Sequence, residues 1–344
     1  MHIVFTLCSS NYLAHAKALG DSLREHDPDC HFVIGLVDRV PSELESTYWR
    51  PYELIPVEEL NIRGFDAMAD DYNVVELNTA VKPFYIEHLY RSDPAVESVT
   101  YLDPDIIVYS SFARLLGKLK KYSIVLTPHV CSFDNSDINL HAETQVLLVG
   151  IYNLGFIATS RTETTFRFLT WWQKRVRHCC HYRPGSGVFV DQLWVNLAPI
   201  YFPEVYVEKD PGYNMCYWNH FERSLSRENG RYLVNGKHDL VFFHFSAYNP
   251  DKPEVIASRG DLRVMSFAER PELKPVYDDY RDRLLNNGYL SIRSLPYVLR
   301  QKPRMSRWTI KDRIKAPLRR VLEAMPSSVQ KRVRLWRSAK SLPL

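Results

Sequence analysis

Two aspartates stand one residue apart in the segment Asp103-Pro104-Asp105, and apolar residues flank them on both sides. The flanks 99–102 and 106–108 predict a buried strand, a bend fixed by the proline, and a second strand. Carboxylates at such a bend can bind Mg²⁺ or Mn²⁺ through oxygen and leave coordination positions open for the phosphates of a diphosphate. The alternative is a solvated acidic turn, which is common but usually has polar flanks.

Lys82 is a second candidate for binding an anion. It lies in the segment Glu76–Pro83, which opens a predicted helix that continues to Leu89. Pro83 suits the first turn, and Asn78 or Thr79 is expected to cap the helix. The ammonium and the backbone N–H groups of the helix N-terminus could both meet an anion. A surface lysine without a ligand is the alternative.

The first forty residues predict a parallel α/β arrangement. A strand at 3–7 precedes an amphipathic helix at 13–23, and a second strand follows at 32–37. Strand, helix and strand in this order give a parallel pair. Ligands of such sheets bind beyond the carboxyl ends of the strands, so Thr6 to Tyr12 form an expected binding edge. No GxGxxG follows the first strand, and a nicotinamide site is therefore not expected.

The composition is that of an ordinary globular protein. With 344 residues the chain can bury a large core in one domain or two. The six cysteines show no CxxC spacing, so we expect reduced thiols and a cytoplasmic protein. Residues 1–8 lack a basic region ahead of a long apolar stretch, which predicts neither a signal peptide nor a membrane span.

The charge is concentrated at the C-terminal end. Residues 300–344 carry fourteen Lys and Arg against two acidic residues, a net charge of +12, so the total of +4 leaves −8 for residues 1–299. Apolar residues, including Trp308 and Trp336, alternate with the basic ones at helical spacing. This pattern predicts short amphipathic helices on an anionic membrane surface, at the inner face of the cytoplasmic membrane. A solvated basic face is the alternative. A nucleic-acid tail would explain the charge but not the tryptophans, and no nucleic-acid partner is predicted.

Taken in order, several segments resemble the GT-A glycosyltransferases, most of all the retaining branch typified by family 8 galactosyl- and glucosyltransferases. The resemblance spans about residues 3–260 and depends on order and spacing more than on any single motif. Its landmarks are Phe5–Ser10 with Tyr12, the helix with Lys82, Asp103-Pro104-Asp105, Tyr152–Phe156, Asp191-Gln192 and Phe243–Phe245.

This resemblance implies an α/β fold: a GT-A (Rossmann-like) catalytic domain with a mixed central sheet at residues 1–260. A helical extension at 261–299 and the basic amphipathic tail at 300–344 would follow. Segments such as Thr127-Pro128-His129 and Asp210–Asn214 resemble bacterial enzymes of polysaccharide gene clusters. They suggest a role in the synthesis of surface polysaccharide or lipopolysaccharide.

The resemblance also implies a donor site. Thr6, Cys8 and Tyr12 would line the base and ribose of a nucleotide diphosphate sugar. Asp103, Asp105 and His244 would bind the metal that bridges its diphosphate, and Lys82, on the matching helix, stays the candidate for binding an anion. A histidine beside two carboxylates favours Mn²⁺ over Mg²⁺. By itself, a histidine after an apolar run is more often a core residue.

The donor sugar would lie against Asn153, Gly155, Asp191 and Gln192. Gly155 permits close backbone approach, Asn153 and Asp191 could bind hydroxyl groups, and Gln192 would face the anomeric carbon. Glutamine is a poor nucleophile, so same-face attack explains retention better than a covalent intermediate. Asp191 as nucleophile or as helix cap, and a ligand-free turn at 153–155, are the alternatives.

The sequence thus predicts a metal-dependent glycosyltransferase that moves a sugar from a nucleotide diphosphate to a glycan or lipid-linked glycan. It departs from the family after His244, where Ala247 replaces a glycine and Lys252-Pro253 comes two residues late. A nucleotidyltransferase is one alternative, although Cys8–Asn11 lacks the glycine-rich basic loop of that class. A non-catalytic module that binds sugar nucleotides is the other.

Overall fold

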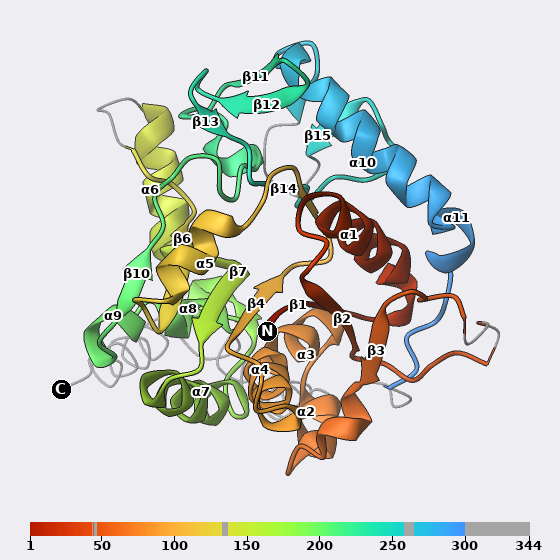
Figure 1. The fold of residues 1–344 in the computed structure, drawn as a ribbon, viewed down its shortest axis with the longest axis vertical. Helices are drawn as coiled ribbons and strands as arrows, with labels where there is room; N and C mark the ends of the chain where they lie inside the picture. Colours follow the sequence, from red (N-terminus) through yellow and green to blue (C-terminus); the bar gives the residue numbers. More distant parts are fainter. Residues whose placement is uncertain (43, 45–46, 133–136, 258–264, 300–344) are drawn as a thin grey trace, which may run out of the picture. The chain divides into compact units, whose positions relative to one another are not determined.

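A seven-stranded mixed sheet forms the centre of the protein in the computed structural model, which describes residues 1–299 except 43, 45–46, 133–136 and 258–264 (Figure 1). Strand β7 runs antiparallel to its neighbours β4 and β6, whereas the other neighbours pair in parallel. The predicted α/β class with a mixed central sheet is confirmed. The strands in spatial order are β10 (Val205–Val207), β6 (Ile124–Pro128), β7 (Tyr152–Ser160), β4 (Ser98–Leu102), β1 (His2–Cys8), β2 (His31–Leu36) and β3 (Glu53–Pro56).

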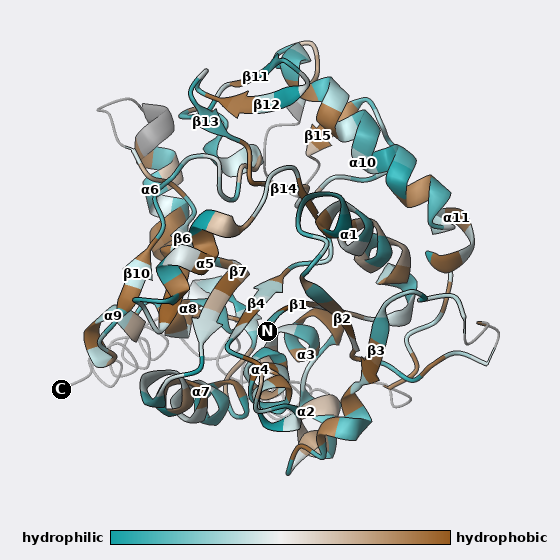
Figure 2. Ribbon diagram, viewed as in Figure 1, coloured by the Kyte–Doolittle hydropathy of each residue, from teal (hydrophilic) through white to brown (hydrophobic). Residues whose placement is uncertain are grey.

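Alternate residues of the central strands point to opposite faces of the sheet, and each face is covered by helices. Val4 of β1 belongs to one buried cluster and Phe5 to the other. Strand β7 is buried along its whole length, because both of its faces are covered, and Figure 2 shows part of it as hydrophobic. The first cluster includes residues of α1 (Leu13–His26), α5 (Ala113–Leu119), α10 (Lys274–Asn286) and α11 (Tyr289–Ile292). The second includes residues of α2 (Phe65–Asp71), α3 (Val74–Ala80), α4 (Lys82–Ser92), α7 (Glu163–Val176), α8 (Gln192–Val195) and α9 (Ala198–Tyr201).

Short strands outside the central sheet complete the fold. The pair β5 (Ile106–Val108) and β14 (Phe242–His244) is antiparallel and matters most for the site. The other small sheets are β11 (Leu225–Glu228) with β12 (Arg231–Val234) and β13 (His238–Asp239), β8 (Tyr182–Arg183) with β9 (Val188–Phe189), and β15 (Val255–Ala257) with β16 (Met265–Ser266). The 3₁₀ turns are η1 (Ser10–Tyr12), η2 (Val57–Leu60), η3 (Pro184–Ser186), η4 (Tyr217–Asn219) and η5 (Pro271–Leu273).

The predicted first strand, helix and second strand are confirmed as β1, α1 and β2, and β1 pairs with β2 in parallel. The single helix expected from Glu76 onward is wrong in one respect, because two helices, α3 and α4, occupy this region. Pro83 lies in the first turn of α4, where its missing N–H breaks no hydrogen bond. The cap of α3 is Asn73, whose side chain accepts from the N–H of Val75 and Glu76. The proposed caps Asn78 and Thr79 lie inside α3.

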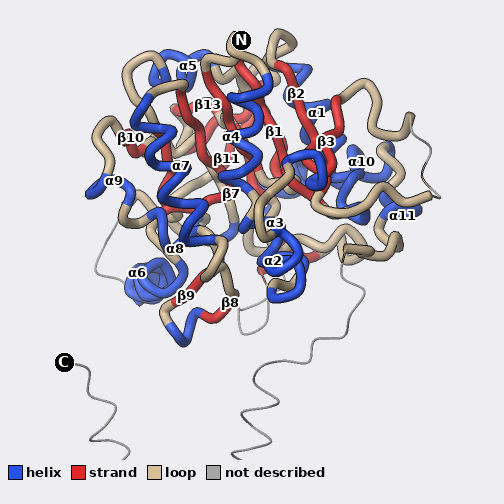
Figure 3. Tube along the Cα trace, turned by 90° about the horizontal axis from the view of Figure 1, so that it is seen from below, coloured by secondary structure: helices blue, strands red, loops and turns tan. Residues whose placement is uncertain are grey.

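Helices α4 and α7 lie side by side over one face of the sheet (Figure 3). On the other face, α10 and α11 contact α1, so the chain from 274 to 292 packs onto the nucleotide-binding half of the predicted site. Within the residues that the structure describes, no helix is long and apolar enough to cross a membrane. The predicted basic tail, 300–344, lies outside the described residues.

Three buried histidines make the stability sensitive to acid. Burial lowers the pKa of His15 and His129 to about 4, and burial together with Arg270 and Arg223 lowers the pKa of His220 to about 3. Below pH 6.5 the unfolded chain therefore binds more protons than the folded one, and the free energy of unfolding falls as the pH falls. Each histidine should cost about 2 kcal/mol at pH 5.

Urea titration at pH 7 and at pH 5 measures this loss. The raised pKa of His244 acts in the opposite direction and reduces the net effect. A His220→Asn variant should lose less stability between the two pH values than the native chain. Equal unfolding free energies at both pH values would contradict the prediction.

Candidate active site

The Asp103-Pro104-Asp105 bend lies at the carboxyl end of β4, and the pairing of β5 with β14 brings His244 beside it (Figure 1). The His244 Nε2 atom lies 3.1 Å from Asp105 Oδ1 and 3.7 Å from Asp103 Oδ2. One ligand atom from each residue falls within 4.8 Å of the others. Two carboxylates and an imidazole at this separation fit one divalent ion of the Mn²⁺ or Mg²⁺ type.

Asn214 fixes the tautomer of His244. The Nδ1 atom of His244 lies 3.2 Å from Asn214 Oδ1, an oxygen that can only accept, so Nδ1 carries the proton. In the metal-free chain Nε2 also carries a proton, which it donates to Asp105 Oδ1 at 3.1 Å. A bound cation would displace that proton, and the Nε2 lone pair would then be free to bind it. Asn214 has a φ of +58°, a left-handed conformation that asparagine tolerates better than most residues.

Gly155 is required by the position of His244. A Cβ atom at this glycine would lie 2.5 Å from His244 Cε1, a distance that side chains do not adopt. The carbonyl of Gly155 also accepts from the N–H of Asp103 at 2.8 Å. The glycine thus allows β7 to pass directly beneath the histidine, although nothing in the contacts requires a sugar there.

The pKa values of the three side chains in the cluster shift in different directions. Burial raises the pKa of Asp105, but the attraction and hydrogen bond of His244 more than offset this effect and hold the pKa below its usual value. Burial lowers the pKa of His244, and Asp105 and Asp103 reverse the shift, so this pKa is raised. Burial raises the pKa of Asp103 despite the opposing charge of Lys82. His244 is only 3% exposed, whereas the side chains of Asp103 and Asp105 keep 30% and 25% of their surface, so the carboxylates face the opening.

Tyr101 holds Asp103 in place. Its hydroxyl donates to Asp103 Oδ1 at 2.6 Å, while the other carboxylate oxygen lies toward His244. The ring is 3% exposed and lies beneath the Lys82 ammonium, 4.3 Å from its centroid. A buried hydroxyl that donates to a candidate metal ligand fixes the direction of that ligand.

Tyr101→Phe should therefore weaken Mn²⁺ binding by about tenfold, because Asp103 loses the bond that orients it. Calorimetric titration of the purified protein with Mn²⁺ measures the change. Tyr90→Phe is the matched control, since it removes a buried hydroxyl that donates to the Thr159 carbonyl at 2.9 Å. Equal Mn²⁺ affinity in the Tyr101 and Tyr90 variants would exclude a positioning role for Tyr101.

Lys82 and Asp191 form a buried ion pair at 2.8 Å, with side chains only 1% and 2% exposed. The ammonium also donates to the Leu154 carbonyl at 2.7 Å. Burial raises the pKa of Asp191, and Lys82 opposes the rise. The structure therefore brings Lys82 to the sugar-binding pair predicted from the sequence. Two of its donor directions are already used within the chain.

An amide network extends from this pair. Gln192 Oε1 accepts from the Leu154 N–H at 2.9 Å, and its Nε2 donates to the Val149 carbonyl at 2.9 Å. Asn153 donates to His129 Nε2 at 3.3 Å and accepts from Asn214 Nδ2 at 3.2 Å. Asn214 thus links Asn153 to His244. Helix α8 begins directly after Asp191, whose side chain makes no capping bond, so the helix-cap alternative for Asp191 is wrong.

The residues expected to line the nucleotide lie at the carboxyl end of β1. Thr6 and Cys8 are buried, whereas Tyr12 is 43% exposed. The Tyr12 ring stacks on His15 at 4.4 Å, and burial together with the charge of Asp105 raises the Tyr12 pKa to about 12. Tyr12 is therefore within electrostatic reach of the metal cluster, while Cys8 Sγ and Thr6 Oγ1 lie inside the protein.

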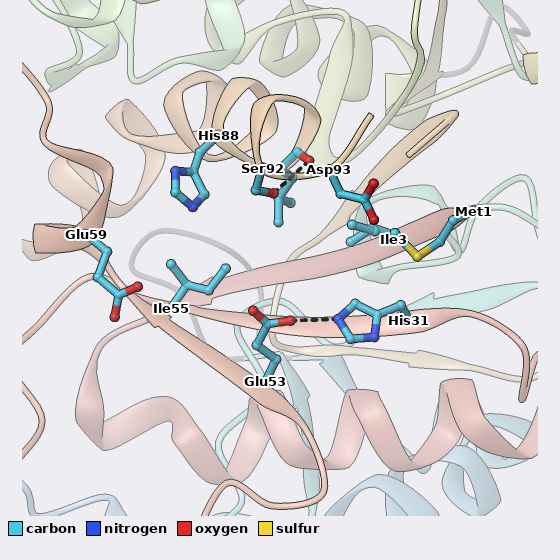
Figure 4. A pocket seen from close by; sticks show the side chains of 10 residues that line it. Met1, Ile3, His31, Glu53, Ile55, Glu59, His88, Ser92 and Asp93 are labelled. Carbon is cyan, nitrogen blue, oxygen red and sulfur yellow. Dashed lines mark hydrogen bonds and ion pairs between the residues drawn. The ribbon is translucent and has the colours of Figure 1, made fainter. Parts of the chain in front are cut away.

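A pocket of about 380 Å³ lies at the opposite edge of the sheet, where β1, β2 and β3 begin (Figure 4). None of the predicted site residues lines it. Its His31 and Glu53 side chains pair at 2.7 Å and are about half exposed. Because ligands of parallel sheets bind at the carboxyl ends of strands, we place the candidate site at the Asp103 bend and not here.

Sequence reasoning missed four residues around the cluster: Tyr101, His129, Asn214 and Trp218. The Trp218 ring packs edge-on against both His244 and His129, with centroids 5.2 and 5.3 Å away. Local sequence gives no sign of these contacts, because they join distant parts of the chain. The motif 210–214 pointed to the right segment but to no role for Asn214.

No family model matches the chain. Two proteins of Bacillus subtilis (strain 168) are similar to it in sequence. The uncharacterized protein YfnF is 26% identical over 283 residues, which cover 81% of this chain and 90% of YfnF. The uncharacterized protein YfnD is 23% identical over 246 residues, which cover 71% of this chain and 76% of YfnD. Neither name states an activity.

Solved structures similar to the protein are glycosyltransferases, the class that the sequence motifs resemble. An active-site mutant of LgtC aligns with 86% of this chain and 98% of its own, at 17% identity and a TM-score of 0.47. The bifunctional glycosyltransferase WbbM aligns with 82% of this chain and 49% of its own, at 15% identity and a TM-score of 0.48. The glycosyltransferase GlyE of Streptococcus pneumoniae TIGR4 aligns with 86% of this chain and 65% of its own, at 14% identity and a TM-score of 0.47. At these identities and TM-scores the similarity does not establish an activity for this chain.

Proposed function

We propose that the protein is a metal-dependent glycosyltransferase that uses a nucleotide diphosphate sugar as donor. The observation that carries the proposal is the cluster of Asp103, Asp105 and His244, whose ligand atoms converge within 4.8 Å at the carboxyl edge of the sheet. The cluster has an exposed aromatic ring, Tyr12, on one side. On its other side lies a buried network of carboxylate and amide groups around Asp191. A nucleotide, a diphosphate and a sugar would meet these three surfaces in that order.

The bound Mn²⁺ or Mg²⁺ would neutralise charge on the departing nucleoside diphosphate. Tyr12 would offer its ring to the base, and His244, Asp103 and Asp105 would hold the ion. The Lys82 ammonium opposes the effect of burial on the Asp191 carboxylate, which would accept hydrogen bonds from sugar hydroxyls. Tyr101 and Asn214 hold Asp103 and His244 in their orientations.

For the retention that the family resemblance implies, Gln192 disfavours a covalent intermediate. Its side chain is bonded on both sides, to the Leu154 N–H and the Val149 carbonyl, and an amide cannot form a glycosyl ester. Asp191 Oδ2 accepts a hydrogen bond from the Lys82 ammonium, which makes this carboxylate a poor nucleophile. We therefore favour attack from the face of the leaving group, with a phosphate oxygen accepting the proton of the acceptor.

The acceptor in this proposal is a glycan or lipid-linked glycan of a surface polysaccharide pathway. Basic residues alternate with apolar ones between 300 and 344, which suits contact with an anionic membrane at its cytoplasmic face. This part of the proposal depends on the sequence alone, because the tail lies outside the described residues.

The test uses the purified protein with Mn²⁺ and a panel of UDP-, GDP-, dTDP- and CDP-sugars. We expect one donor to give a metal-dependent thermal shift and slow hydrolysis, and EDTA to abolish both. Release of pyrophosphate from a sugar phosphate and a nucleoside triphosphate would instead favour a nucleotidyltransferase. Binding of a donor without hydrolysis or transfer would favour a non-catalytic module, and no response to any donor would contradict the proposal.

A further inference from the structure

Helix α6 (Asp137–Val149) is rich in apolar residues, yet none of residues 140–149, all of which the structure describes, is buried. The apolar residues of this stretch are Leu140, Ala142, Val146, Leu147, Leu148 and Val149. Helix α7, by comparison, buries Phe168, Leu169 and Trp172. An apolar helix that contributes to neither core cluster in the described chain has an apolar surface with no partner.

The two sides of α6 differ in exposure. Ala142, Val146 and Val149 are half-buried and recur at helical spacing, so they form the side toward the protein. Leu140, Leu147 and Leu148 are 60%, 74% and 40% exposed and form the outward side. Leu140 and Leu147 lie two turns apart on one face. Figures 1 and 3 both show α6 at the margin of the fold, and in Figure 3 it lies at the end of the sheet away from the N-terminus.

The carboxyl end of α6 is part of the candidate active site. The Val149 carbonyl accepts from Gln192 Nε2, and a Cβ atom on Gly150 would lie 3.1 Å from Gln192 Cγ. The Ile151 N–H donates to Asn196 Oδ1 at 2.9 Å, and its carbonyl accepts from the His129 N–H at 3.0 Å. The outward leucines of α6 therefore lie directly before the residues that bond to Gln192.

The position and charge of α6 indicate what covers it. The helix follows β6 and leads into β7, and Figure 1 shows it across β4 and β14 from α1. A nucleotide bound at the start of α1 would therefore lie away from it. It carries Asp137 and Glu143 but neither lysine nor arginine, which disfavours an anionic headgroup. Hydrocarbon is the chemistry that its leucines fit.

We propose that the outward leucines of α6 bind a hydrocarbon chain attached to the acceptor sugar, so that the acceptor is a glycolipid. The inference builds on the proposed transferase function and adds the acceptor class and its binding surface. The sugar of such an acceptor would lie next to the donor sugar, on the side of Gln192 where α6 ends, and its chain would run along Leu147 and Leu140.

The test compares octyl β-D-glucoside, below its micellar concentration, with methyl β-D-glucoside as ligands of the full chain. We expect the octyl compound to bind at least about tenfold more tightly, and the double variant Leu140→Gln/Leu147→Gln to lose that preference. Ile200→Gln is the matched control, because Ile200 is 75% exposed on α9 and does not belong to α6. It should keep the preference.

Three results would overturn the proposal: no octyl preference in the native chain, an unchanged preference in the double variant, or a native dimer that the double variant dissociates in light scattering. The last result would identify a second copy as the occupant of α6. Donor hydrolysis is measured on the same samples. Its absence would contradict the transferase function, whereas the binding comparison still decides whether α6 holds a hydrocarbon chain.

Discussion

Asp105→Ala should lower metal-dependent hydrolysis of the nucleotide sugar by about 10³-fold or more. Asp105 is the carboxylate nearest to His244 Nε2, and its pKa is held low, so it is ionised and ready to bind a cation at neutral pH. Without it the cluster keeps one carboxylate and one imidazole, too few ligands to hold an ion against a mobile diphosphate. Steady-state hydrolysis at saturating Mn²⁺ gives the rate, and calorimetry gives the Mn²⁺ affinity.

The control for this variant is Asp278→Ala. Asp278 pairs with Lys274 on α10, both residues are about half exposed, and the pair is of the i,i+4 type. Removal of this carboxylate should leave Mn²⁺ affinity and hydrolysis unchanged. The Asp105 variant should fold, since its side chain is one-quarter exposed. Full hydrolysis by a folded Asp105→Ala protein would exclude the cluster as the metal site.

The local parts of the site could be predicted from the sequence, because they depend on neighbouring residues. Apolar flanks around Asp103 and Asp105 are enough to predict strand, bend and strand, and β4 and β5 confirm it. The end of β1 likewise follows from the strand and helix pattern. Here the hydrophobic periodicity and the turn chemistry are properties of a short segment.

The pairings across the fold could not be predicted in this way. His244 reaches Asp105 only because β14 pairs with β5, and residue spacing says nothing about that register. In the sequence, Tyr101 is only one of the apolar residues of a predicted strand. The structure shows that its hydroxyl donates to Asp103 Oδ1 at 2.6 Å. Family resemblance supplied His244 as a candidate, but it gave no indication of Asn214, which holds the ring.

The departure of this sequence at Ala247 has a structural counterpart. Ala247 has a φ of +63°, in the left-handed region where glycine is free of strain and alanine is not. The backbone after His244 therefore adopts a conformation that a glycine would take without strain. Just before Ala247, the Phe245 N–H donates to the Asp105 carbonyl at 2.8 Å and ties this segment to the metal cluster.

Lys82→Met should destabilise the protein by about 3–5 kcal/mol, because it leaves the Asp191 carboxylate buried without its cation. Both side chains are almost fully enclosed, and Lys82 is the cation that opposes the effect of burial on Asp191. Urea unfolding at pH 7 measures the loss. Lys274→Met is the matched control, since the exposed pair of Lys274 with Asp278 should contribute less than about 0.5 kcal/mol.

The double variant Lys82→Met/Asp191→Asn separates the ion pair from its parts. With no buried charge left, it should recover most of the stability that Lys82→Met loses, because the penalty comes from the unpaired carboxylate and not from lost packing. Donor hydrolysis should nevertheless stay low in the double variant if Asp191 binds the sugar as an anion. A stable Lys82→Met protein, or a double variant no more stable than Lys82→Met, would show that the pair does not hold this part of the site together.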